Sequence, residues 1–396
     1  MRPSRKRAVK TGRTQIDPRL ADRLRFFEER RENIVDTIRE LVETESPSDN
    51  KQAVDRLGQL LAGKFSAIGG RVQFHRTSGF GDHLQVDFPG NSAKPVLLLG
   101  HLDTVYPMGT LETMPCRARD GRLWGPGTLD MKSGIGLMLH VIEGLRNWHG
   151  NLPRPVTVLL VSDEEVGSDS SRQITERLAK ESAAVLVLEP SYGLHGAVKT
   201  ARKGVGEYQV KVTGVAAHSG LDFEKGQSAI LELARQIQKI ATFTDLKRGL
   251  TLNVGLVQGG TRVNVVAAEA TATVDARISR AKDGALVDKK MRSLRPVNRK
   301  CKVTVTGGVN RPPMERTPGV AALYEKAGEI AKGLGWKLGE AAVGGGSDGN
   351  FTAGLGIPTL DGLGGVGEGA HAVHESILIS ELPRRVALLA GLIETV

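Results

Sequence analysis

The chain has 396 residues, of which 40% are hydrophobic and 25% charged, the balance of a folded protein rather than of a disordered or fibrous one. Because a single core rarely grows beyond about 250 to 300 residues, this length predicts more than one domain. Its apolar runs are far shorter than the roughly 18 residues that span a bilayer, and two cysteines are too few for a disulfide framework or a thiolate metal site.

The net charge of +10 is unevenly placed, because six positive charges fall within the first fourteen residues, which hold no acid. Such a segment is typical of a solvated terminus, and we expect a basic flexible tail over residues 1–20, with nucleic-acid contact as the less favoured alternative. Aromatic residues make up only 4% of the chain, which argues against a base-stacking surface. No apolar stretch of the kind found in secretory signals follows the basic start, so we expect a cytoplasmic protein.

Two amphipathic helices are predicted first, over residues 21–45 and 53–68, because apolar residues recur there at helical spacing. From residue 95 the pattern changes to short runs rich in Val and Leu. These runs predict buried strands at residues 96–100, 156–162 and 183–189.

Helices are plausible between these strands, over residues 134–145 and 170–179. The alternation predicts an α/β catalytic domain with a mostly parallel central sheet. We expect it to be formed by two parts of the chain, residues 21–202 and 313–396, the second with helices and a short strand of its own.

A different pattern interrupts this domain over residues 203–312. The expected order there is β-α-β-β-α-β, which is that of a self-contained ferredoxin-like α+β unit. The expected elements are strands at 206–213, 251–257, 270–278 and 302–306, with helices at 229–241 and 285–294.

Residues that can bind a metal follow the predicted strands of the α/β domain. In an open α/β sheet the carboxyl ends of the strands meet in one crevice. Taken singly, a histidine in a loop or a pair of acids in a turn is usually structural, and Asp130 would serve as a helix cap. Together they favour a metal site, because clustered carboxylates repel one another unless a cation offsets them. The candidates are His101, Asp103, Asp130, Asp163, Glu164, Glu165 and Glu189, with His371 or His374 as a further donor.

Imidazole and carboxylate donors suit zinc, and also manganese or cobalt. There are enough of them to hold two ions that share a bridging ligand. The adjacent acids Glu164 and Glu165 would then divide two tasks, one as ligand and one as general base. Asp103, two residues after His101, is placed to accept the other imidazole N–H and to fix its tautomer.

The sequence resembles the M20 metallopeptidase family, and within it the glutamate carboxypeptidase (carboxypeptidase G2-like) branch. The likeness runs from about residue 32 to the C-terminus, and its motifs occur in the family's order. They are GHLDTVYP, GPGTLDMKSGIG, SDEEVGS, LEPS, GVAAHSG, GGGSDGNF and a closing His-x-x-x-Glu from His371 to Glu375.

The resemblance implies a di-zinc catalytic domain and an inserted lid domain through which subunits dimerise. Carried over motif by motif, it makes Glu164 the general base and Asp103 the orienting partner of His101. His371 is preferred to His374 because it lies four residues before Glu375. The implied metal ligands are His101, Asp130 as the bridge, Glu165, Glu189 and His371.

The resemblance also assigns residues that face the substrate. His218 is expected to donate to the developing oxyanion, either within its own chain or across a dimer. Asn264 and Arg277 are expected to contact the substrate carboxylate, which suits the planar fork of arginine. Gly345 and Gly346 fall in an expected substrate-backbone loop. For each the alternative is ordinary: a turn histidine, a surface charge or a flexible turn.

The expected activity is metal-dependent hydrolysis of an amide or peptide bond next to a free C-terminal carboxylate, with release of an acidic residue such as glutamate. The substrate would be a small N-acyl amino acid or short peptide. An N-acyl-amino-acid deacylase or a dipeptidase on the same di-metal framework is the alternative. A nucleic-acid-binding protein on an inactive scaffold is the rival of another class, and the complete ligand set argues against it.

Overall fold

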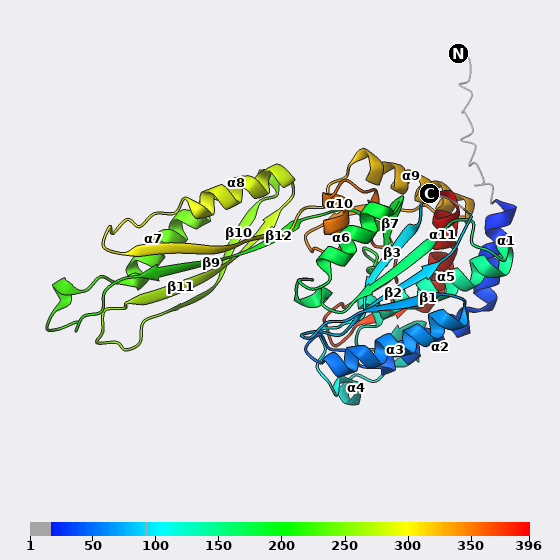
Figure 1. Cartoon of the computed structure of the whole chain (residues 1–396), viewed down its shortest axis with the longest axis horizontal. Helices are drawn as coiled ribbons and strands as arrows, with labels where there is room; N and C mark the ends of the chain where they lie inside the picture. Colours follow the sequence, from blue (N-terminus) through cyan, green and yellow to red (C-terminus); the bar gives the residue numbers. More distant parts are fainter. Residues whose placement is uncertain (1–16, 92–93) are drawn as a thin grey trace, which may run out of the picture.

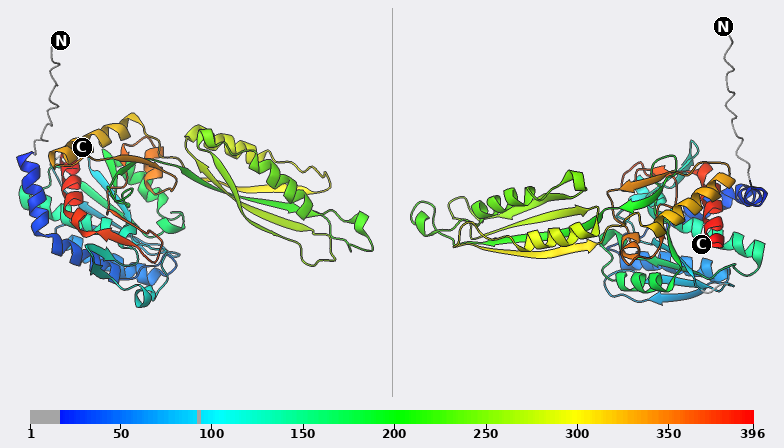
Figure 2. Two further views of the ribbon diagram at one scale, coloured as in Figure 1. Left: turned by 180° about the vertical axis from the view of Figure 1, so that it is seen from behind. Right: turned by 90° about the horizontal axis from the view of Figure 1, so that it is seen from above.

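The computed structural model describes residues 17–91 and 94–396, which form a rounded body and an elongated arm (Figure 1). The arm, residues 204–311, is called the lid here, and the other described residues are the body. Figure 2 shows from two further sides that the lid extends clear of the body. Most of the expected basic tail falls on residues 1–16, which lie outside the described residues.

The body is built around a six-stranded sheet in the order β1-β2-β6-β3-β7-β14. The pairs β6–β3, β3–β7 and β7–β14 are parallel, whereas β1 and β2 add an antiparallel edge. The expected α/β class with a mostly parallel sheet is confirmed, and the antiparallel edge is an addition to it. The strands are β1 (Arg71–His75), β2 (His83–Phe88), β3 (Val96–His101), β6 (Val156–Val161), β7 (Ala184–Val187) and β14 (Thr359–Leu360).

All six residues of β3 are buried, which explains why its sequence is apolar from Val96 to Leu99. Leu98 belongs to the main hydrophobic core, which includes residues of α5 (Ser133–His149). Its neighbour Leu99 belongs to a second cluster that includes residues of α6 (Arg172–Glu181). A strand covered by helices on both faces needs apolar side chains at successive positions.

The first expected helix, over residues 21–45, is in fact two helices. α1 (Pro18–Glu29) and α2 (Arg31–Glu43) are separated by Arg30, whose ψ of 13° lies outside the helical range. The break lets α1 pack against α11 (Leu382–Thr395) while α2 packs against α5. Periodicity could not reveal it, because both halves are amphipathic. The remaining helices of the body are α3 (Lys51–Ala67), α4 (Thr110–Thr113), α9 (Pro318–Gly333) and α10 (Gly349–Gly354).

The lid has an antiparallel sheet in the order β10-β11-β9-β12 and two helices, in the expected chain order β-α-β-β-α-β. Alternate residues of β9 are buried, and these include Tyr208, Val210 and Val212 of the lid core. The elements are β9 (Gly204–Thr213), α7 (Ala229–Ala241), β10 (Thr251–Gly259), β11 (Glu269–Ile278), α8 (Ala281–Arg292) and β12 (Lys302–Arg311).

Two smaller sheets complete the body. β8 (Val198–Arg202) leads into the lid and pairs in parallel with β13 (Glu340–Val343). A four-stranded sheet in the order β15-β16-β5-β4 brings the chain near the C-terminus beside the segment that precedes α5. Its strands are β4 (Arg117–Arg119), β5 (Arg122–Trp124), β15 (Gly367–Glu368) and β16 (Ser376–Leu378).

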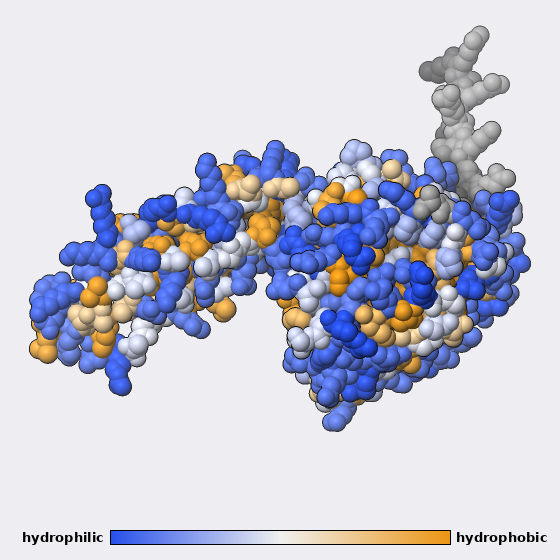
Figure 3. Space-filling view, viewed as in Figure 1, coloured by the Kyte–Doolittle hydropathy of each residue, from blue (hydrophilic) through white to orange (hydrophobic). Residues whose placement is uncertain are grey.

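A hollow separates the lid from the body on the face shown in Figure 3. Among the helices of residues 17–91 and 94–396, none has the length and apolar character that crossing a membrane requires.

Candidate metal centre

The candidate site lies where the parallel strands of the body end. His101 is the last residue of β3, and Glu189 lies two residues beyond β7. Glu164 and Glu165 belong to the single turn that follows β6. Because β3 pairs in parallel with both β6 and β7, these ends meet at one edge of the sheet.

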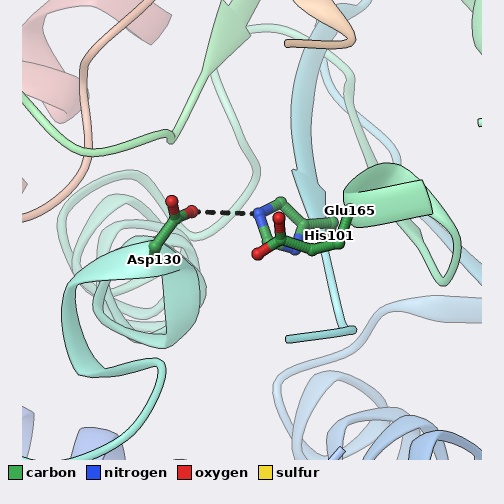
Figure 4. Close-up of side chains that lie close together, drawn as sticks. All are labelled: His101, Asp130 and Glu165. Atoms are coloured by element: carbon green, nitrogen blue, oxygen red, sulfur yellow. Dashed lines mark hydrogen bonds and ion pairs between the residues drawn. The ribbon is translucent and has the colours of Figure 1, made fainter. Parts of the chain in front are cut away.

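Asp130 lies between two imidazoles. Its Oδ1 is 3.2 Å from His101 Nε2, and its Oδ2 is 3.4 Å from His371 Nε2. Glu189 Oε1 lies 3.6 Å from His101 Nε2, and Glu165 Oε1 lies 3.3 Å from His371 Nε2. The cluster therefore has two halves, each with one imidazole and one carboxylate, that share Asp130. Figure 4 shows Asp130 facing His101, with Glu165 alongside.

The donor set fits a pair of metal ions. Glu165 Oε1 is buried, and the polar atom that faces it among the described residues is His371 Nε2, 3.3 Å away. Burial and the nearby charge of Asp130 raise the pKa of Glu189 to about 7, although Arg202 opposes the shift. Hydrogen bonds with Asp130 and Glu165 raise the pKa of His371 to about 10, which shows how strongly these carboxylates attract positive charge. Imidazole nitrogen and carboxylate oxygen are the ligands that zinc accepts.

Glu375 fixes the turn that carries Asp130. Its Oε1 accepts the backbone N–H groups of Leu129 and Asp130 at 2.7 and 2.9 Å, and its Oε2 accepts that of Gly127 at 3.0 Å. The Tyr106 hydroxyl also donates to Oε2, at 2.5 Å. Sequence reasoning used Glu375 only to choose between two histidines. The structure gives it the further task of positioning Asp130, the expected bridging carboxylate.

Asp103 differs in detail from its expected role. His101 Nδ1 lies 2.8 Å from the main-chain carbonyl of Asp103, and only 3.5 Å from its carboxylate. The carboxylate instead accepts the backbone N–H groups of Glu164 and Glu165 at 3.3 and 3.2 Å. It also accepts the Ser48 hydroxyl at 2.7 Å. Asp103 thus holds His101 chiefly through its backbone and the acidic turn through its side chain.

Arg311, the last residue of the lid strand β12, was missed by sequence reasoning. Its Nη2 lies 2.9 Å from Glu164 Oε1 and 3.0 Å from Asp348 Oδ1, and it donates to the Ser168 hydroxyl at 2.7 Å. Burial nevertheless raises the pKa of Glu164 well above its ordinary value, against the opposing charge of Arg311. A guanidinium of the lid therefore holds one oxygen of the expected general base.

Arg202, at the end of β8, was missed as well. It forms a two-pronged ion pair with Asp361 at 2.7 and 2.8 Å and lies 3.3 Å from Glu189 Oε2. It also donates to the carbonyls of Gly345 and Gly346, at 3.3 and 3.1 Å. The expected substrate-backbone loop is thereby connected to Glu189, an expected metal ligand, through one buried cation. An arginine and an aspartate 159 residues apart give no signal of this in sequence.

The other residues predicted for the lid do not reach the cluster. His218 follows β9, which leads away from the body, and it pairs with Val265 in an exposed segment at the remote end of the lid (Figure 1). Asn264 lies beside it, since its carbonyl accepts the N–H of Ser219. Arg277 lies near the body, where it pairs with Asp275 at 3.0 Å.

His371 and His374 are both exposed, and it is His371 whose Nε2 lies beside Asp130 and Glu165. The geometry therefore groups His371, and not its neighbour, with the other expected ligands.

Comparison with known proteins places this geometry in a family. Residues 97–395 match the model of peptidase family M20/M25/M40. The chain belongs to that family. It is 31% identical to carboxypeptidase G2 of a Pseudomonas species over 371 residues, which cover 91% of this chain and 88% of the relative. The protein is accordingly a metallopeptidase.

Solved structures share the fold. Aminopeptidase PepT from Bacillus cereus superposes with a TM-score of 0.76 at 24% identity, covering 92% of this chain and 98% of that one. The YxeP protein of Bacillus subtilis, described as a dinuclear metal binding peptidase of the M20 family, gives a TM-score of 0.69 at 13% identity, covering 93% and 98%. Both likenesses concern the fold alone and extend over more than nine-tenths of this chain.

Proposed function

We propose that this metallopeptidase hydrolyses an amide or peptide bond next to a free C-terminal carboxylate and releases an acidic residue such as glutamate. The proposal rests on the two-sided cluster about Asp130, with Glu164 in the same crevice. The likeness to carboxypeptidase G2 supports the type of bond. An N-acyl-amino-acid deacylase or a dipeptidase remains the alternative, because both reactions would use the same centre.

Two zinc ions are the proposed cofactors, with cobalt or manganese as alternatives. His101 and Glu189 would hold one ion, His371 and Glu165 the other, and Asp130 would bind both. Such a pair, when bound, lowers the pKa of water and polarises the scissile carbonyl.

Glu164 is the proposed general base. It lies within the same group of metal-capable atoms as His101 and Glu189, while Arg311 holds its Oε1. In this role it removes the proton of the attacking water at its carboxylate and returns that proton to the leaving amine nitrogen. A buried carboxylate with a raised pKa is suited to both halves of this transfer.

Arg277 is proposed to bind the free carboxylate of the substrate. Arg277 of β11 pairs with Val205 of the central strand β9, and Arg311 of β12 pairs with the same Val205 from the other edge of β9. Directly opposed residues of antiparallel strands share a face of the sheet. Two guanidinium groups therefore lie on one face of the lid at its body end, and an arriving carboxylate would compete with Asp275 for Arg277.

A homodimer through the lid is part of the proposal. β10 is an edge strand that carries the exposed side chains Leu256 and Val257, and the helix packed on it, α7, exposes Ile230 and Leu231. Figure 3 shows apolar patches along the lid. An exposed apolar edge is typical of a surface that pairs with another chain. Pairing of two lids would also bring His218 and Asn264 toward the partner's crevice, which they do not reach in their own chain.

The test uses protein that is stripped with a chelator and reloaded with zinc, cobalt or manganese. We expect the highest kcat/KM on N-acylglutamate, compared with N-acetylated neutral amino acids and with dipeptides. A clear preference for either of the other two groups would favour the corresponding alternative. Inactivity toward all three groups with every metal would contradict the proposed function.

A further inference from the structure

A substrate that ends in glutamate brings two carboxylates, and a site selective for it needs a second cation near the crevice. Five lysine and arginine residues are buried in the described part of the chain. They are Lys132, Lys199, Arg202, Arg311 and Arg385. Because burying a charge without a partner is costly, the contacts of each one bear on its function.

Four of the five have partners within the protein. Lys132 Nζ donates to the carbonyl of Thr44 at 2.8 Å. Arg202 is held by Asp361 and Glu189, and Arg311 by Glu164 and Asp348, as described above.

Arg385 donates to the carbonyls of Gly196, Gly362 and Gly364. Arg202 and Arg311 are thus paired with acids, whereas Lys132 and Arg385 donate to main-chain carbonyls, so each of these four cations has at least one acceptor within the protein.

Lys199 is the exception. The residue is only 8% exposed, yet its ammonium makes no hydrogen bond or ion pair with any residue in 17–91 or 94–396. The acid beside it is already engaged: the Lys199 backbone exchanges hydrogen bonds with Asp361 at 2.7 and 3.2 Å, but the Asp361 carboxylate is bound by Arg202. Lys199 thus lies next to the network that reaches Glu189 and carries a charge that this network leaves unpaired.

The surroundings of Lys199 connect it to the crevice. Burial lowers the pKa of its ammonium and the charge of Arg202 adds to this, whereas Asp361, Glu189 and Asp130 act in the opposite direction. Gly362 leaves room for its stem, because a Cβ at that position would lie 3.1 Å from Lys199 Cγ. The ammonium is therefore desolvated, within the influence of the metal-facing carboxylates, and without an anion of its own.

We propose that Lys199 binds the side-chain carboxylate of the residue that the enzyme releases, and that it determines the preference for an acidic residue there. This inference rests on the proposed function. It assigns the two carboxylates of a terminal glutamate to two different cations, the free main-chain carboxylate to Arg277 and the side-chain carboxylate to Lys199. The competing role for Lys199 is a fixed counter-charge that only offsets the acids of the centre.

The experiment compares Lys199→Met with the wild-type enzyme, both loaded with zinc, on N-acylglutamate and N-acylglutamine. These substrates differ only in the charge of the side chain. Because Lys199→Met removes a hydrogen bond to a charged group, we expect its kcat/KM on N-acylglutamate to fall by about 10- to 100-fold, mostly through a higher KM. On N-acylglutamine we expect a change of less than about threefold. Lys199→Arg should restore part of the preference, because it keeps the charge.

Lys203→Met is the matched control, since this half-buried lysine lies four residues further on and its side chain approaches Gly249 of the lid. It should leave the ratio of the two kcat/KM values unchanged. Metal content and thermal unfolding identify a Lys199 variant that has lost the centre or the fold, in which case Lys199→Arg and Lys199→Gln provide the comparison.

An equal loss on both substrates would assign Lys199 to the counter-charge role and overturn the inference, and so would no loss on either. A wild-type enzyme with equal kcat/KM values on N-acylglutamine and N-acylglutamate would overturn the inference and the preference for an acidic residue, but would leave intact the proposed hydrolysis next to a free C-terminal carboxylate. Inactivity of the wild-type enzyme on all C-terminal substrates would overturn both.

Discussion

The crevice of the body and the remote end of the lid differ in how completely the chain builds them. In the crevice, Asp130 lies between two imidazoles, and its turn is fixed by Glu375. At the end of the lid, His218 and Asn264 are exposed, and their backbones pair with Val265 and Ser219 of neighbouring lid segments. Both regions carry residues that the sequence marked as functional.

This difference separates two parts of catalysis. The groups expected to hold metal and move protons are positioned by contacts within one chain. The residue expected to stabilise the developing oxyanion depends on a movement of the lid or on a second copy of the chain. Perturbing each region separately should therefore give different results.

The largest expected effect is in the crevice. Glu164→Gln removes the proposed general base but none of the five expected metal ligands. We expect kcat on N-acylglutamate to fall by about 10² to 10⁴-fold while two ions remain bound per chain. The measurement is steady-state kinetics together with elemental analysis, with Glu181→Gln, an exposed acid of α6, as the control. Near-normal turnover in Glu164→Gln would remove Glu164 from the mechanism.

The next effect distinguishes a second copy from a lid movement. His218→Ala should lower kcat by about 10²-fold, as for loss of an oxyanion donor. If His218 serves the partner's crevice, equal amounts of Glu164→Gln and His218→Ala subunits, mixed and reassociated, should regain about a quarter of wild-type activity, because half of the dimers then contain one intact site. Should the mixture stay as inactive as its components, His218 acts within its own chain or not at all.

A smaller effect concerns the support of Asp130. Glu375→Gln replaces one carboxylate oxygen by an NH2 group, so the buried backbone N–H groups that this oxygen accepts lose their acceptor. We therefore expect the free energy of unfolding to fall by about 2 to 4 kcal/mol. Tyr106→Phe, which removes only one hydroxyl donor to the same carboxylate, should cost about 1 kcal/mol. Chemical denaturation measures both. Equal values for the two variants would argue against a special role of Glu375 in holding the turn.

Much of the crevice could be predicted because parallel strands end at one edge. His101, Glu165 and Glu189 follow three apolar runs, and the pairing of β3 with β6 and β7 brings them together. The break between α1 and α2 and the antiparallel edge of β1 and β2 could not be predicted in this way. Their causes are packing against distant helices and strands, which local periodicity does not report.

The two arginines of the site escaped prediction for a related reason. Arg202 and Arg311 follow strands in the manner of ordinary surface charges, and nothing local shows that each will be buried against an acid far along the chain. The positions of the acids after predicted strands indicated that they would lie close together. Nothing in the sequence indicated which arginines would bind them. Lys199 gives no local signal either, because its lack of an acidic partner depends on how the other buried charges are paired in the folded chain.

The most direct test of the two-sided centre is metal titration of chelator-stripped protein, followed by calorimetry and elemental analysis. We expect two zinc ions per chain in the wild type, and loss of one ion in His101→Ala or in His371→Ala. Asp130→Ala should weaken both sites, and His374→Ala should weaken neither. Binding of two ions that is unaffected by Asp130→Ala, or failure of the wild type to bind a second ion, would contradict a centre shared through Asp130.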